Sequence, residues 1–228
     1  MNVITTASTA VKTVAIQPLR MAKLEFHLKG SAPLMVCKFS TKAQHKMETA
    51  QEAGSAAKTK KNREARNFAA DCEAARHVFL DAAGNEHDGI SAAAFRNASI
   101  DACRAAGFVM TKAKLGIFCE ADGYDRDDGT PLVGIRSDTP YEMSKMAVRN
   151  ANGSMDIRSR PMWRDWSMVV RMRFDLDIFS EMDVANLMRR VGEQVGIGEG
   201  RPFGSSGFGM GYGLFDITHM GRFESSAI

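Results

Sequence analysis

The clearest structural signal in this sequence is the stretch WSMVVRMRFDLDI, residues 166–178. Apolar and polar side chains alternate along it, which is the period of a β-strand with one face in a core and the other in water. The side chains expected to point inward are Trp166, Met168, Val170, Met172, Phe174, Leu176 and Ile178. This stretch predicts a sheet strand, and the segments around it indicate which fold the sheet belongs to.

A helix is predicted directly after this strand. Ser180 and Asp183 have the spacing of a capping box. Apolar residues then recur at intervals of three and four, and Arg189 and Arg190 lie where the helix dipole favours cations. The apolar stripe consists of Val184, Leu187, Met188, Val191 and Val195. A closing strand is expected at 208–214, where large side chains alternate with glycines.

Two further strands and a helix are predicted before residue 166. Residues 23–29 and 115–119 alternate as strands do. From Ile90 onward the spacing becomes helical, and Gly107 is a plausible end of that helix. Its expected stripe is Phe95, Ala98, Ala102, Ala105 and Val109. A helical stretch is also expected at 64–79, whereas residues 137–162 carry little periodic signal.

The elements follow one another as strand, helix, strand, strand, helix, strand. This order predicts an α+β fold with a ferredoxin-like core, which is the βαββαβ or RRM-like plan. Two large insertions would interrupt it, at about 30–89 and about 120–165. We expect one domain at 23–228, preceded by an N-terminal arm at 1–22 that is rich in Thr, Ser, Ala and Val.

Composition excludes several classes of protein. The 228 residues include 44% hydrophobic and 25% charged residues, which is typical of a globular chain and not of a disordered one. The formal net charge is only +3, so any strong attraction for an anionic partner must come from local clusters. The four cysteines form no CxxC pair, which argues against a zinc ribbon or a disulfide framework. No apolar run is long enough for a membrane span, and we expect a cytoplasmic protein.

A glycine-rich stretch, VGIGEGRPFGSSGFGMGYG at 195–213, is the strongest local signal. Glycines leave peptide N–H groups bare, so a phosphate can approach the backbone closely, and Arg201 adds a bidentate phosphate donor. The sequence therefore predicts a phosphate cradle that includes Gly198, Gly200, Gly204 and Arg201. The alternative is a flexible loop with a tightly packed glycine face. No GK[ST] follows, so the stretch is not a Walker A loop.

Basic residues gather in two regions. Lys58, Lys60, Lys61, Arg63 and Arg66 fall within nine residues. A second cluster surrounds Trp163 and Trp166 and consists of Lys145, Arg149, Arg158, Arg160, Arg164, Arg171 and Arg173. Arginines that pair with phosphates beside aromatic rings that stack on bases suit single-stranded nucleic acid. The alternative for each cluster is a solvated charged surface.

Three short motifs occur in the order found in a known family. The glycine loop before a last strand resembles the signature of the RAMP superfamily, above all of the subunits that coat guide RNA in CRISPR effector complexes. The stretch GISAAAFRNASIDACR, residues 89–104, is similar to the segment that opens the first helix of those subunits, and Arg96 is its basic residue one turn later. The APL turn at 32–34 lies where the family places a comparable turn.

The resemblance implies a backbone subunit that binds single-stranded RNA, with single-stranded DNA as the alternative ligand. Its partners would be copies of itself in a helical filament, together with other CRISPR effector subunits, in a bacterial or phage-infected cell. The insertion at 120–165 would correspond to a thumb that reaches the next subunit. The residues implied to contact nucleic acid are Lys58, Lys60, Lys61, Arg63, Arg66, Arg96, Arg158, Arg160, Arg164, Gly198, Gly200, Arg201 and Gly204.

No catalytic, cofactor or metal site is predicted. Some branches of the family cut RNA with an aspartate in the loop after the first strand, but residues 30–47 contain neither Asp nor Glu. We interpret the acidic run with Asp122, Asp125, Asp127 and Asp128 as a solvated turn. The five histidines, His27, His45, His77, His87 and His219, have no metal-binding spacing and are expected to be surface or cap residues.

Two other functions remain open. One is a viral antagonist that imitates such a subunit and blocks a CRISPR effector complex. The other is a metal-dependent RNA-processing nuclease. Copurification with an effector complex would favour the first, and cleavage of labelled RNA with magnesium or manganese would favour the second.

Overall fold

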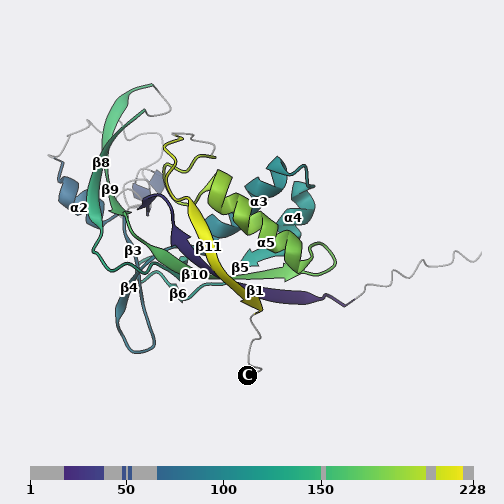
Figure 1. Cartoon of the computed structure of the whole chain (residues 1–228). Helices are drawn as coiled ribbons and strands as arrows, with labels where there is room; N and C mark the ends of the chain where they lie inside the picture. The colour runs from purple at the N-terminus through teal and green to yellow at the C-terminus, as the bar shows by residue number, and fades with distance from the viewer. Residues whose placement is uncertain are drawn as a thin grey trace, which may run out of the picture.

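The computed structural model describes residues 18–38, 48–49, 51–52, 66–149, 153–203 and 209–222. Within these residues the chain forms antiparallel sheets with helices beside them, as Figure 1 shows, so the predicted α+β class is confirmed. The elements are β1 (Met21–Gly30), β2 (Leu34–Met35), α2 (Phe68–Glu73), β3 (His77–Leu80), β4 (Glu86–Ser91), α3 (Ala92–Ala105), α4 (Met110–Gly116), β5 (Ile117–Cys119), β6 (Gly123–Tyr124), β7 (Pro131–Gly134), β8 (Glu142–Arg149), β9 (Met155–Trp163), β10 (Ser167–Asp175), α5 (Glu181–Arg190), the π-helical turn η2 (Val191–Val195) and β11 (Phe215–Arg222).

The main sheet has the strand order β11-β1-β10-β5, and all neighbouring strands are antiparallel. Along the chain, α3 lies between β1 and β5, and α5 lies between β10 and β11. Helices α3, α4 and α5 gather on one side of this sheet (Figure 1). The side chains of the sheet that face them form the main hydrophobic core together with Phe95, Val184 and Met188.

The alternation that predicts the long strand is confirmed through Phe174. Trp166, Met168, Val170, Met172 and Phe174 are all buried. Leu176 and Ile178 are also expected to point inward, but they are not buried. Strand β10 ends at Asp175, and the chain turns there. Strand β1 confirms the alternation at 23–29.

Helix α5 begins at its predicted cap, and the predicted stripe runs through α5 into η2. Ser180 and Asp183 form a complete capping box, and all five predicted stripe residues are buried. The stripe of α3 is only partly confirmed. Helix α3 ends at Ala105, and Gly107 has a φ of 72°, which agrees with the predicted end of the helix. Ala105 and Val109 are exposed, so they do not belong to the buried stripe.

Three predicted elements are wrong in part. The helix expected at 64–79 is the short α2, and Val78 and Phe79 belong to strand β3, where they pair with β4. Leu115 lies in helix α4 and is exposed, so strand β5 begins only at Ile117. The closing strand is β11 and not 208–214, because Gly209, Gly211 and Gly213 adopt positive φ values that a strand does not allow, while Phe208 lies outside the described residues.

Residues 137–162, which carry little periodic signal, contain almost all of the long hairpin of β8 and β9. The hairpin rises away from the main sheet (Figure 1). It packs on β2 in a second sheet of order β2-β9-β8, over a small core of Met35, Met146, Val148 and Met162. Met143, Met155 and Ile157 of the hairpin are exposed, so apolar side chains occur on both its buried and its exposed positions, and this removes the alternation.

Gly192 packs where no side chain fits. A Cβ built on Gly192 would lie 2.2 Å from the carbonyl oxygen of Phe215, the first residue of β11. Backbone cannot give way there without moving a core strand. The glycine therefore lets the start of η2 lie directly against the main sheet.

We predict that Gly192→Ala lowers the free energy of unfolding by about 2 to 3 kcal/mol, because the methyl group overpacks the contact with Phe215. The matched control is Gly84→Ala, since Gly84 has a φ of 86° but nothing within 4 Å of an added Cβ. The control costs only the backbone strain, about 1 kcal/mol. Urea denaturation measures both variants, and equal losses would contradict the packing explanation.

Candidate functional site

A cleft of about 310 Å³ lies beside the glycine-rich segment. Five parts of the chain meet there: the residues after β2, strand β3, the end of strand β4, the first turns of α3 and the segment that follows η2. The lining residues are Val36, Cys37, His77, Ile90, Ser91, Ala94, Asn97, Gly198, Glu199 and Arg201. Its volume is in the range of small-ligand sites.

The amino end of α3 forms one wall of this cleft. Ser91 is the N-cap, and its hydroxyl accepts a hydrogen bond from the Ala93 N–H at 3.3 Å. Alanines occupy the first three positions of the helix, so its own side chains there are short. The N-terminus of a helix of 14 residues carries partial positive charge, which favours an anion at this wall.

The glycine-rich segment forms the opposite wall and packs closely on its own protein. Gly198 has a φ of 76°, and a Cβ on it would lie 2.4 Å from the carbonyl oxygen of Met35. A Cβ on Gly200 would lie 2.7 Å from the ring of Tyr212. The predicted bare backbone is therefore in contact with β2 and with Tyr212 at these two positions, which agrees with the alternative of a packed glycine face. Gly204 lies outside the described residues.

Three of the predicted arginines lie around this wall, each beside a carboxylate. Arg201 pairs with Asp101 of α3 at 2.9 Å. Arg160 pairs with Glu199 at 2.7 Å, and Arg158 lies 3.8 Å from the same carboxylate. The arginines on this wall are therefore already engaged with carboxylates of the same protein.

The remaining predicted contacts are spread over the molecule. Arg66 pairs with Asp71 and Asp156, and Arg164 pairs with Glu142 at the base of the hairpin. Arg96 donates to the carbonyl oxygens of Lys114 and Ile117 and so fixes the start of β5. None of these three lines the cleft. Four more predicted contacts lie outside the described residues, namely Lys58, Lys60, Lys61 and Arg63.

Cys37 lines the cleft as a neutral thiol. Although the residue is exposed, desolvation of the sulfur and, next, the Glu199 carboxylate raise the pKa of Cys37 to about 11. A thiol with this pKa is a poor nucleophile at neutral pH. Nucleophilic catalysis by Cys37 is therefore disfavoured.

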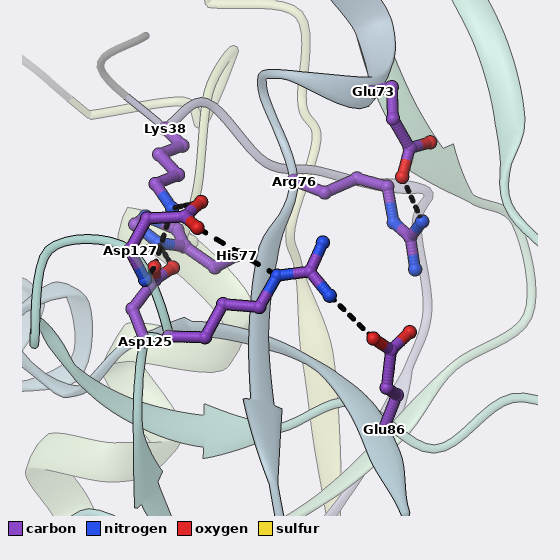
Figure 2. A network of polar contacts seen from close by, with 8 residues as sticks. Lys38, Glu73, Arg76, His77, Glu86, Asp125 and Asp127 are labelled. Atoms are coloured by element: carbon purple, nitrogen blue, oxygen red, sulfur yellow. Dashed lines mark hydrogen bonds and ion pairs between the residues drawn. The ribbon is translucent and has the colours of Figure 1, made fainter. Parts of the chain in front are cut away.

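His77, which lines the cleft, also belongs to a buried ion-pair cluster that Figure 2 shows. Lys38 binds Asp125 at 2.5 Å and Asp127 at 2.7 Å, and the Nδ1 atom of His77 lies 2.7 Å from the Asp125 carboxylate. The side chains of Lys38 and Asp125 are 3% and 0% exposed. The prediction of a solvated turn is thus wrong for Asp125, and the prediction of a surface position is wrong for His77.

Ionisation of Asp125 is strongly favoured in the folded protein. Burial works to raise its pKa, but hydrogen bonds from Lys38, the Asp127 N–H and His77 outweigh it and lower the pKa to about 2. No sequence spacing indicates this cluster, because Lys38, His77 and Asp125 come from three distant segments. The cluster ties the residues after β2 to the third sheet, of order β3-β4-β7-β6.

We predict that Lys38→Met lowers the free energy of unfolding by about 3 to 5 kcal/mol, because it leaves a buried carboxylate without its counter-ion. The matched control is Lys29→Met, which breaks a solvent-exposed ion pair with Asp165. The control should cost less than about 1 kcal/mol. Chemical denaturation at pH 7 compares the two variants, and similar small losses in both would be inconsistent with a buried pair.

Acid should reduce the difference between wild type and Lys38→Met. A carboxyl whose folded pKa is lowered contributes stability that is complete above its unfolded pKa, about 3.9, and is lost as the pH falls through its folded pKa, about 2. The unfolded chains of the two proteins titrate alike, so the stability difference should shrink as the pH falls from 7 toward about 2, where Asp125 of the folded wild type also takes up a proton. Denaturation curves across this range measure it, and a difference that stays constant would refute the assignment.

Comparison with known proteins adds no relative. No protein-family model matches the sequence, and no curated protein is significantly similar to it. Across the part of the chain that the structure describes, no helix is both long enough and apolar enough to span a membrane.

Proposed function

We propose that the protein binds single-stranded RNA as a RAMP-like backbone subunit, with copies repeating along the strand as a filament. The proposal includes a ferredoxin-like core. It is supported by the strand order β11-β1-β10-β5, with one helix after the first strand and one after the third. It is also supported by the position of the glycine-rich segment, between the second core helix and the last strand.

The cleft carries this proposal. A strand backbone that enters it meets the N-terminal N–H groups of α3 on one side and the Arg201 side chain on the other. Both are donors that phosphates prefer, and the second is bidentate. Neither requires a particular base, so binding through them is independent of sequence.

The hairpin of β8 and β9 supports repetition along the strand. It projects from the main sheet (Figure 1), and Met143, Met155 and Ile157 leave apolar surface exposed on it. An exposed apolar surface on a projecting element suits contact with a neighbouring subunit. Under this proposal the hairpin takes the place of the thumb.

The decisive experiment adds one negative charge to the cleft without disturbing the fold. Asn97 is exposed on α3 and lines the cleft, so Asn97→Asp is nearly isosteric and places a carboxylate beside a bound phosphate. We predict that it weakens binding of a 30-nucleotide single-stranded RNA about tenfold at low salt. Fluorescence anisotropy measures the affinity, with a DNA strand of the same sequence as the second ligand.

The matched control is Asn186→Asp, the same substitution at an exposed position of α5 away from the cleft. It should leave the affinity within twofold of wild type. Binding should also weaken steeply as salt rises, because each phosphate contact releases counter-ions. If neither RNA nor DNA binds at low salt, or if both substitutions weaken binding equally, the proposal fails.

A further inference from the structure

Three metal-ligating side chains converge behind the cleft. His77 comes from β3, whereas Asp125 and Asp128 come from the turn between β6 and β7. One ligand atom from each lies within 4.8 Å of the other two. His77 and Asp125 are buried, whereas Asp128 is exposed to solvent.

The turn that carries the two aspartates is held in shape by its own backbone. The Asp125 N–H donates to the carbonyl of Thr130 at 2.8 Å, and the Gly129 N–H donates to the carbonyl of Asp125 at 2.9 Å. The Asp127 N–H donates to Oδ1 of Asp125, also at 2.9 Å. Asp125 is thus fixed before any ligand binds. The exposed Asp128 side chain accepts a hydrogen bond from the Thr130 N–H through Oδ1 at 2.9 Å, so the same turn also holds this second carboxylate near the other two side chains.

The two carboxylate oxygens of Asp125 have different surroundings. Oδ1 accepts from Lys38 and from the Asp127 N–H. Oδ2 lies 2.7 Å from Nδ1 of His77. A metal ion between Oδ2 and Nδ1 would replace that one hydrogen bond, with the imidazole proton on Nε2, and Lys38 would keep its contacts with Oδ1 and with Asp127.

Among the described residues, carboxylates outnumber cations in and around this group. Lys38 pairs with Asp125 and Asp127. Arg126 pairs with Glu86 and lies 3.8 Å from Asp127, and the exposed Asp128 adds a further carboxylate. Figure 2 shows Lys38, His77, Asp125 and Asp127 gathered together.

We propose that His77, Asp125 and Asp128 bind one divalent transition-metal ion, Zn²⁺ or Mn²⁺. One imidazole nitrogen with two carboxylates is a donor set that both ions accept. Ligand atoms at about 2.1 Å from a tetrahedral zinc ion lie about 3.4 Å apart, and the three ligand atoms here lie within 4.8 Å of one another. Rotation of the exposed Asp128 side chain would bring them to the shorter spacing, in exchange for its hydrogen bond from the Thr130 N–H. The ion would join β3 to the turn between β6 and β7.

The test uses the full chain without a polyhistidine tag and without nucleic acid, so its result does not depend on the proposed function. The protein is stripped with a chelator, and Zn²⁺ or Mn²⁺ alone is titrated by calorimetry, with metal content measured after gel filtration. We expect one ion per chain for at least one of the two metals. At a hundredfold excess over Kd, that metal should raise the Tm by about 5 °C or more.

Asp128→Asn removes an exposed ligand and should leave the fold intact. It should weaken metal binding about tenfold or more, whereas Asp216→Asn, a change at an exposed aspartate of β11, should leave the Kd unchanged. Failure of the wild type to retain either ion overturns the proposal. Equal affinity of Asp128→Asn and wild type also overturns it, because the ion would then be held elsewhere, for example by cysteines.

Discussion

Strands β1 and β10 pair from Met21 opposite Asp175 to Lys29 opposite Ser167, and this register fixes what faces the helices. Because side chains alternate along a strand, Leu24 and Phe26 on one strand and Met172 on the other point into the same core. A slip of one residue would turn all of them toward water. Helices α3 and α5 pack on this face of the sheet. The same register therefore positions the amino end of α3 and the glycine-rich segment after α5, which both line the cleft.

Elements that bury one face completely could be predicted from the sequence. Strand β10 and helix α5 belong to this group, because each contributes an unbroken stripe to the main core. The hairpin of β8 and β9 could not, because its own core is small and apolar side chains such as Met155 also occur on its exposed positions. The alternating glycines before β11 imitate a strand in sequence, yet positive φ at Gly211 and Gly213 makes them a turn.

The site was predictable where its residues are close in sequence. Gly198 and Arg201 stand three residues apart, and both line the cleft. His77 and Asp125 are separated by 48 residues and meet only because β3 and the turn after β6 belong to one sheet. Single-sequence patterns describe what neighbours along the chain share, and they contain no information on such pairs.

The ion pairs of the cleft limit how strongly one copy can bind a nucleic acid. Arg160 already pairs with Glu199, and Arg201 already pairs with Asp101. A phosphate that replaces one of these carboxylates therefore gains only the difference in free energy between two charge-assisted hydrogen bonds. Under the proposed function, tight binding must then come from many copies on one strand, since each bound copy raises the effective concentration of strand for the next. A chain with nearly neutral overall charge and a weak individual site suits a protein that acts by repetition.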